Sequence, residues 1–121
     1  MVARILMADD NEAFREVTAQ LLEKVGYGVA TVGDGRQALQ TVAEFRPDLV
    51  LLDVIMPGMS GIDVLKEIRE QDPLIGVVMM TAYGSEDVAV EALTAGADDY
   101  LMKPPDYEEA FIRLERVLAR S

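Results

Sequence analysis

The sequence has 121 residues, half of them hydrophobic and 27% charged, which is typical of a single compact domain, here over residues 1–121. It has no cysteine and no histidine, which excludes disulfides, thiolate metal sites and histidine-based acid–base catalysis. The net charge of −11 argues against direct contact with nucleic acid, and the short apolar N-terminus predicts no signal peptide or membrane span, so we expect a cytoplasmic location.

Strands and helices are predicted to alternate along the first half of the chain. Residues 4–8 predict a strand, and the helix that follows is expected to bury Phe14, Val17, Leu21 and Val25. Gly26 and Gly28 are expected to end that helix, and residues 29–32 to form the second strand. The second helix, capped by Asp34 and ended by Pro47, is expected to pack through Ala38, Leu39, Val42 and Phe45.

The second half of the chain continues the alternation. The continuous apolar run at 49–52 predicts a strand buried on both faces, which stops at Asp53. Ser60 and Asp63 resemble a capping box before a helix with Ile62, Leu65 and Ile68 inward. The remaining elements are expected to be a strand at 75–80, a helix at about 86–95 with Val88, Ala92 and Leu93 inward, a strand at 100–102, and a C-terminal helix marked by Phe111, Leu114, Val117 and Leu118.

Five strands that alternate with five helices predict an α/β fold in which all strands are parallel and helices cover both faces. The expected architecture is a flavodoxin-like (βα)5 doubly wound sandwich with the strand order 2-1-3-4-5.

Polar residues follow four of the predicted strands at the point where each strand ends. They are Asp9 and Asp10, Asp53, Thr81 and Lys103. Taken singly, each is more simply explained as a helix cap, a turn or a solvated surface position. Ligands of open parallel sheets bind outside the carboxyl ends of the strands, near the point where strand order reverses, so the coincidence of these residues predicts one site.

The chemistry of these side chains indicates a cation and a phosphoryl group. Converging carboxylates repel one another unless a cation is present, and oxygen ligands without histidine or cysteine favour Mg²⁺, Mn²⁺ or Ca²⁺ over zinc. Thr81 and Lys103 supply a hydroxyl and an ammonium that suit phosphoryl oxygens. An aspartate carboxylate can itself form an acyl phosphate, so these residues suffice for phosphoryl transfer.

The chain resembles the response-regulator receiver domains of bacterial two-component signalling. The matching segments are Asp9-Asp10, Leu-Leu-Asp53-Val-Ile-Met-Pro57-Gly-Met-Ser-Gly61, Met-Thr81-Ala and Gly96-Ala-Asp-Asp-Tyr-Leu-Met-Lys103-Pro104. The resemblance implies that Asp53 accepts a phosphoryl group from a sensor histidine kinase, a histidine phosphotransfer protein or a small donor such as acetyl phosphate. It also implies an Mg²⁺ (or Mn²⁺) ion bound by Asp10, Asp53 and the backbone carbonyl of Ile55, with Asp9 assisting through water.

The resemblance implies a switch as well. Thr81 and Lys103 would bind phosphoryl oxygens, and Tyr100 would move inward after Thr81, which changes the face formed by the fourth helix, fifth strand and fifth helix. That face could hold an output domain or a second copy of the chain. A cis peptide is implied between Lys103 and Pro104. Such a domain promotes only its own phosphorylation and dephosphorylation, so we do not expect an enzyme.

Three positions depart from the family pattern or adjust it. Pro105 stands where an aromatic residue is common, which puts the usual packing of the loop before the last helix in doubt. Ile55 and Tyr83 occupy positions that affect water access to the phosphorylated residue, and both are bulky without a group that orients water. They predict slow self-dephosphorylation.

Other classes share part of this pattern. An aspartate-nucleophile, Mg²⁺-dependent phosphatase would use the same residue types, but it resembles an Asp-x-Asp pattern on the first strand and carries a cap segment over the substrate. A flavin carrier would need a phosphate-binding loop where this chain has the acidic segment Asp-Asp-Asn-Glu at residues 9–12. A structural pseudo-receiver would lack one of the key residues, and none is missing.

Overall fold

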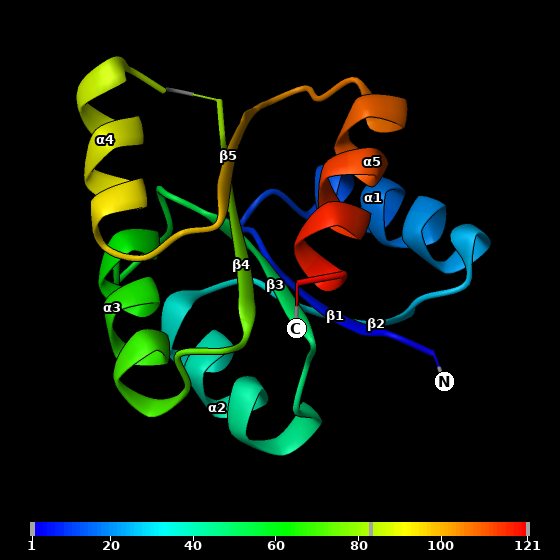
Figure 1. The fold of residues 1–121 in the computed structure, drawn as a ribbon, viewed down its shortest axis with the longest axis horizontal. Coiled ribbons are helices and arrows are strands. Elements are labelled where there is room, and N and C mark those ends of the chain that lie inside the picture. Colours follow the sequence, from blue (N-terminus) through cyan, green and yellow to red (C-terminus); the bar gives the residue numbers. More distant parts are fainter. Residues whose placement is uncertain (1, 83, 121) are drawn as a thin grey trace.

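The computed structural model describes residues 2–82 and 84–120, and within them five strands alternate with five helices (Figure 1). The elements are β1 (Arg4–Ala8), α1 (Glu12–Val25), β2 (Gly28–Val32), α2 (Gly35–Phe45), β3 (Leu49–Asp53), α3 (Gly61–Gln71), β4 (Gly76–Thr81), α4 (Glu86–Thr94), β5 (Asp99–Met102) and α5 (Tyr107–Leu118). All ten predicted elements are present, with ends displaced by a few residues at most. Gly28 begins β2 and does not end α1, a role that belongs to Gly26 with its φ of 112°.

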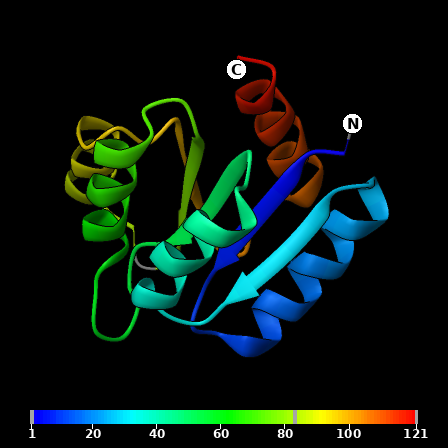
Figure 2. The same ribbon diagram turned by 90° about the horizontal axis from the view of Figure 1, so that it is seen from below.

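The strands form one parallel sheet in the order β2-β1-β3-β4-β5, as predicted. Helices α1 and α5 cover one face, and α2, α3 and α4 cover the other (Figures 1 and 2). Every residue of β3 and β4 is buried, so the apolar run at 49–52 is indeed a strand covered on both faces. The carboxyl ends of all five strands lie along one edge of the sheet, because the strands are parallel.

Side-chain caps start the helices where the sequence predicts them. Asp34 accepts a hydrogen bond from the N–H of Gln37 at 2.8 Å, and Ser60 accepts one from the N–H of Asp63 at 3.2 Å. Asn11 caps α1 in the same way by accepting from the N–H of Phe14 at 3.0 Å. These bonds satisfy N–H groups that the first helical turn leaves unpaired.

The predicted buried face of α1 is partly wrong. Val17 and Val25 are 52% and 50% exposed, whereas Thr18, Ala19 and Leu22 are buried. The helix is rotated relative to the apolar spacing because Thr18, a polar residue, is acceptable inside: its hydroxyl lies 2.7 Å from that of Tyr107 on α5. Leu93 of α4, also predicted to lie inward, is 50% exposed, whereas Ala92 is buried as predicted.

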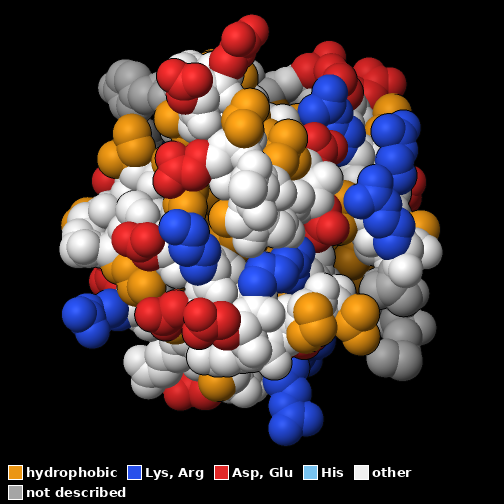
Figure 3. Space-filling model, turned by 60° about the vertical axis from the view of Figure 1, so that its left-hand side comes forward, with side chains coloured by type: hydrophobic (Ala, Val, Ile, Leu, Met, Phe, Trp, Pro, Cys, Tyr) orange, Lys and Arg blue, Asp and Glu red, His pale blue; other side chains and the backbone are white. Residues whose placement is uncertain are grey.

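The side of the molecule turned forward in Figure 3 carries acidic and basic side chains interspersed, with hydrophobic side chains in small separate groups. No helix within residues 2–82 and 84–120 is both long enough and apolar enough to cross a bilayer.

Candidate phosphoryl and cation site at the strand ends

Four neighbouring strands bring the predicted site residues to one rim. Asp9 directly follows β1, Asp53 is the last residue of β3, Thr81 is the last residue of β4, and Lys103 directly follows β5. The backbone N–H of Lys103 donates to the carbonyl of Thr81 at 2.9 Å, which extends the pairing of β4 and β5 by one residue. The fold therefore assembles the site from segments far apart in the sequence.

Three carboxylates meet at this rim. One oxygen of each of Asp9, Asp10 and Asp53 lies within 4.8 Å of the others. Asp9 and Asp53 are 2% and 6% exposed, whereas Asp10 is exposed to solvent. Lys103 joins the two buried carboxylates: its Nζ is 2.5 Å from Oδ2 of Asp9 and 3.0 Å from Oδ2 of Asp53. The cavity above them has a volume of about 360 Å³ and is also lined by Asn11, Ile55 and Ala82.

Burial and the contacts between Lys103 and the carboxylates have opposite effects on the pKa values of Asp53 and Lys103. Burial raises the pKa of Asp53 above its ordinary value of 3.8, and the nearby Asp9 carboxylate raises it further, while Lys103 and the Ile55 N–H oppose the change. Burial alone would lower the pKa of Lys103, but its hydrogen bonds to Asp9 and Asp53 outweigh that effect and raise it. Lys103 is thus held as an ammonium between two carboxylates.

The donor set fits a hard divalent cation. Three carboxylates and one ammonium leave this cluster with a formal charge of −2, and the folded environment disfavours the charge on Asp53. A divalent cation would remove that excess charge, and oxygen ligands alone favour Mg²⁺ or a similar ion. Asp9, Asp10 and Asp53 are the residues that could hold it.

Ile55 lies beside Asp53 as its position in the sequence suggests. Its N–H donates to Oδ1 of Asp53 at 3.3 Å, and its side chain is 53% exposed at the mouth of the cavity. Tyr83, the other residue expected to limit water access, lies outside the described residues.

Thr81 and Tyr100 lie behind the rim. Thr81 is 1% exposed, and the next residue, Ala82, lines the cavity in its place. The Tyr100 hydroxyl is buried and makes no hydrogen bond within the described part of the chain, and burial raises its pKa above 10.0. A Cβ added to Gly84 would overlap this hydroxyl and Sδ of Met102, so a larger residue at position 84 would require these side-chain ends to move.

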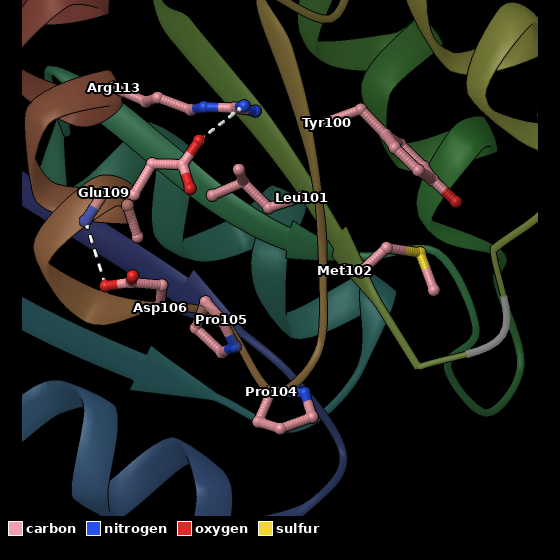
Figure 4. Close-up of a pocket in the computed structure, with 9 residues that line it drawn as sticks. Tyr100, Leu101, Met102, Pro104, Pro105, Asp106, Glu109 and Arg113 are labelled. Carbon is pink, nitrogen blue, oxygen red and sulfur yellow. Dashed lines mark hydrogen bonds and ion pairs between the residues drawn. The ribbon is translucent and has the colours of Figure 1, made fainter.

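The segment that follows β5 is ordered despite Pro105. The Lys103–Pro104 peptide bond is cis, and Asp106 caps α5 by accepting from the N–H groups of Glu108 and Glu109. A cleft of about 350 Å³ lies between β5 and the first half of α5 (Figure 4). Tyr100 and Met102 project from β5 away from this cleft, toward α4 (Figure 4).

Two contributors to the site escaped the sequence analysis. Phe14 was predicted only to be buried and Asn11 was not among the predicted site residues, yet Asn11 lines the cavity and the Phe14 ring centroid lies 4.7 Å from Nζ of Lys103. A hydrophobic residue in the first turn of an amphipathic helix carries no sequence signal that separates ring–cation contact from ordinary packing. Only the spatial approach of α1 and the segment after β5 reveals it.

The fold and the rim define a small doubly wound α/β domain with an acidic, ammonium-bridged centre at the strand ends. Comparison with known proteins makes this assignment specific: residues 5–115 match the family described as the response regulator receiver domain. Among relatives, the DNA-binding response regulator MtrA of Mycobacterium leprae is 44% identical over 121 residues, which are 100% of this chain and 53% of MtrA. The transcriptional regulatory protein ZraR of Escherichia coli K12 is 48% identical over 97% of this chain and 26% of ZraR.

Comparison with solved structures leads to the same family. A CheY-like response regulator receiver domain protein from Methanospirillum hungatei JF-1 superposes with a TM-score of 0.95 at 31% identity, over 99% of this chain and 96% of that one. The chain belongs to the response regulator receiver domain family, whose members act in two-component phosphorelay signalling. It spans about half or less of the length of the curated relatives named above. Membership in this family disfavours the phosphatase alternative.

Proposed function

We propose that this domain accepts a phosphoryl group on the carboxylate of Asp53 from a phosphohistidine of a sensor kinase or phosphotransfer protein. The single observation that carries the proposal is the buried Asp53 carboxylate with one oxygen on Lys103, 3.0 Å away, at a cavity open to solvent. In this reaction an Asp53 oxygen attacks phosphorus, the bond from phosphorus to the donor nitrogen breaks, and the electron pair of that bond stays with the imidazole.

The chain's other groups have separate roles in the proposal. Lys103 neutralises charge on the phosphoryl oxygens and on Asp53, and Thr81 supplies a hydroxyl to the same oxygens. Asp9, Asp10, Asp53 and the Ile55 carbonyl would hold Mg²⁺ (or Mn²⁺), and Asp9 would do so through water. The ion, when bound, offsets the negative charge of the carboxylates and of the incoming phosphoryl group.

The proposed readout runs through Thr81 and Tyr100. A phosphoryl group brings a charge of about −1.5 to −2 and strong acceptor oxygens to the rim, which favours a shift of Thr81 toward it. The Tyr100 ring lies on the α4 side of β5, so its position is sensitive to the segment between β4 and α4. The resulting change on the α4-β5-α5 face would be read by an output domain or by a second copy of the chain.

The domain promotes only its own phosphorylation and dephosphorylation and has no separate substrate. It does so in the cytoplasm, where it meets the kinase. MtrA is named a DNA-binding regulator, and this chain spans 53% of it. The net charge of −11 is unfavourable for contact with a phosphate backbone. We therefore assign any contact with DNA by a longer protein that contains this domain to another of its segments.

Incubation with acetyl phosphate, with and without Mg²⁺, tests the proposal by intact mass. The expected result is one added phosphoryl group in the presence of Mg²⁺ that is lost in Asp53→Ala. The matched control is Glu70→Gln, which removes an exposed carboxylate from α3 and should leave the mass gain unchanged. A mass gain that survives Asp53→Ala, or one indifferent to Mg²⁺, would refute the assignment.

A further inference from the structure

A closed cycle of contacts surrounds the Lys103 ammonium. Oδ1 of Asp9 accepts from the N–H of Asn11 at 2.9 Å, and Oδ1 of Asn11 accepts from the N–H of Phe14 at 3.0 Å. The Phe14 ring centroid lies 4.7 Å from Nζ of Lys103, and Nζ returns to Oδ2 of Asp9 at 2.5 Å. The Asp9 carboxylate therefore holds Asn11, the cap of the helix that carries the ring, and also binds the ammonium that the ring contacts.

The ring and the carboxylates constrain different directions of the ammonium. Asp9 and Asp53 attract it toward the rim, and the electron-rich face of Phe14 receives it on the side of α1. Only 11% of the Lys103 side chain is exposed, so a cation–π contact here acts with little competition from water. Without the ring, the flexible four-carbon stem of lysine could carry the ammonium into solvent.

A second contact links α1 to the first residue of α5. One turn along α1 from Phe14, the Thr18 hydroxyl is 2.7 Å from the hydroxyl of Tyr107, the first residue of α5. The Tyr107 ring also packs on Phe111 with centroids 5.9 Å apart. Helix α1 thus contacts both Lys103, the first residue after β5, through Phe14, and Tyr107, the first residue of α5, through Thr18.

We propose that Phe14 is a positioning residue for phosphoryl transfer: its ring fixes the ammonium of Lys103 over the phosphoryl site, and Asn11 fixes the ring. The proposal rests on the function proposed for Asp53 and Lys103. It adds that α1 controls the reaction rate from a position that touches neither the phosphoryl group nor the carboxylate that receives it.

The test uses the 121-residue chain with Phe14→Leu, which removes the ring but keeps apolar volume, and Phe14→Tyr, which keeps a ring. Val17→Leu is the control, because Val17 is 52% exposed on the same helix. The first measurement is the rate of phosphorylation against acetyl phosphate concentration in Mg²⁺. We expect Phe14→Leu to lower the rate about threefold to tenfold, the change that corresponds to loss of a partly buried cation–π contact, and Phe14→Tyr and Val17→Leu to match the wild type.

The second measurement, exchange of the lysine ammonium protons with water followed by NMR, needs no phosphoryl donor. Lys24 and Lys66 are exposed and exchange fast, so the slow signal reports Lys103. Faster exchange in Phe14→Leu and slow exchange in Phe14→Tyr would support the positioning role. Wild-type exchange and rate in Phe14→Leu, or a Phe14→Tyr variant as impaired as Phe14→Leu, would overturn it. A wild-type chain that takes no phosphoryl group would refute the proposed function alone, since the exchange data would still decide the role of Phe14.

Discussion

Replacing Asp53 by asparagine should stabilise the protein in buffer that contains no divalent cation, although it removes the proposed phosphoryl acceptor. The carboxylate is 6% exposed and has two like charges, on Asp9 and Asp10, at no more than 4.8 Å. With an effective dielectric constant of about 20, a separation of 4.8 Å gives a repulsion of about 3.5 kcal/mol between Asp53 and the buried Asp9, whereas water screens the exposed Asp10. The attraction to Lys103 at 3.0 Å is about 5.5 kcal/mol on the same scale.

The repulsion from Asp9 alone is smaller than the attraction to Lys103, so burial of the carboxylate decides the balance, and the pKa of Asp53 is raised as a result. We expect Asp53→Asn to raise the free energy of unfolding by about 1 to 2 kcal/mol, which corresponds to a rise in Tm of about 4 to 8 °C for a domain of this size. Magnesium should reduce the difference, because an ion that binds only the folded wild type at ten times its Kd adds about 1.4 kcal/mol.

The assay is thermal unfolding of both proteins with EDTA and with Mg²⁺, across a range of pH. The folded state raises the pKa of Asp53 above 3.8, so it holds a proton there more tightly than the unfolded chain does. That contribution to stability is complete below pH 3.8 and is lost as the pH rises through the raised pKa. The two Tm values should thus converge in acid and separate toward neutral pH. A lower Tm for Asp53→Asn in EDTA, or an equal gain from Mg²⁺ in both proteins, would refute the electrostatic account.

Three further perturbations test other parts of the structure. Thr18→Val should lower the free energy of unfolding by about 1 kcal/mol in chemical denaturation, because it leaves the Tyr107 hydroxyl without its partner. The double variant with Tyr107→Phe should lose less free energy of unfolding than the sum of the two single variants, and strict additivity would contradict this. Gly84→Ala should displace the Tyr100 ring toward water and return its phenol pKa toward 10.0 in an NMR titration, and an unmoved ring signal would count against the steric argument. Ile55→Asn should shorten the lifetime of the phosphorylated state measured by intact mass, since it places an amide that can orient water at the 53% exposed position beside Asp53; an unchanged lifetime would remove Ile55 as a determinant.

The order of the elements and the convergence of the site residues at one edge of the sheet could be predicted, because both depend on local sequence patterns. Apolar strands that alternate with amphipathic helices imply a parallel sheet, and a parallel sheet places all strand ends at one edge. Asp9, Asp53 and Lys103 were therefore expected to converge before any distance between them was known, and Lys103 does bridge the two carboxylates.

The orientation of α1 could not be predicted in the same way. Apolar spacing placed Val17 and Val25 inward, but the helix buries Thr18 through a hydrogen bond to Tyr107, a residue 89 positions away in the sequence. The role of Phe14 depends on the same approach of α1 to the segment after β5. Both features arise from contacts between distant segments, which hydrophobic periodicity within one helix does not encode.

The assembly of the rim from β1, β3, β4 and β5 has a consequence during synthesis of the protein. A nascent chain that has emerged only through β4 already contains all three carboxylates but not Lys103, the ammonium that joins Asp9 to Asp53. Until β5 docks, Lys103 cannot join the carboxylates of Asp9 and Asp53. Competence for phosphoryl transfer should therefore arise only once the sheet is complete, so that an unfinished receiver cannot divert phosphoryl groups from finished ones.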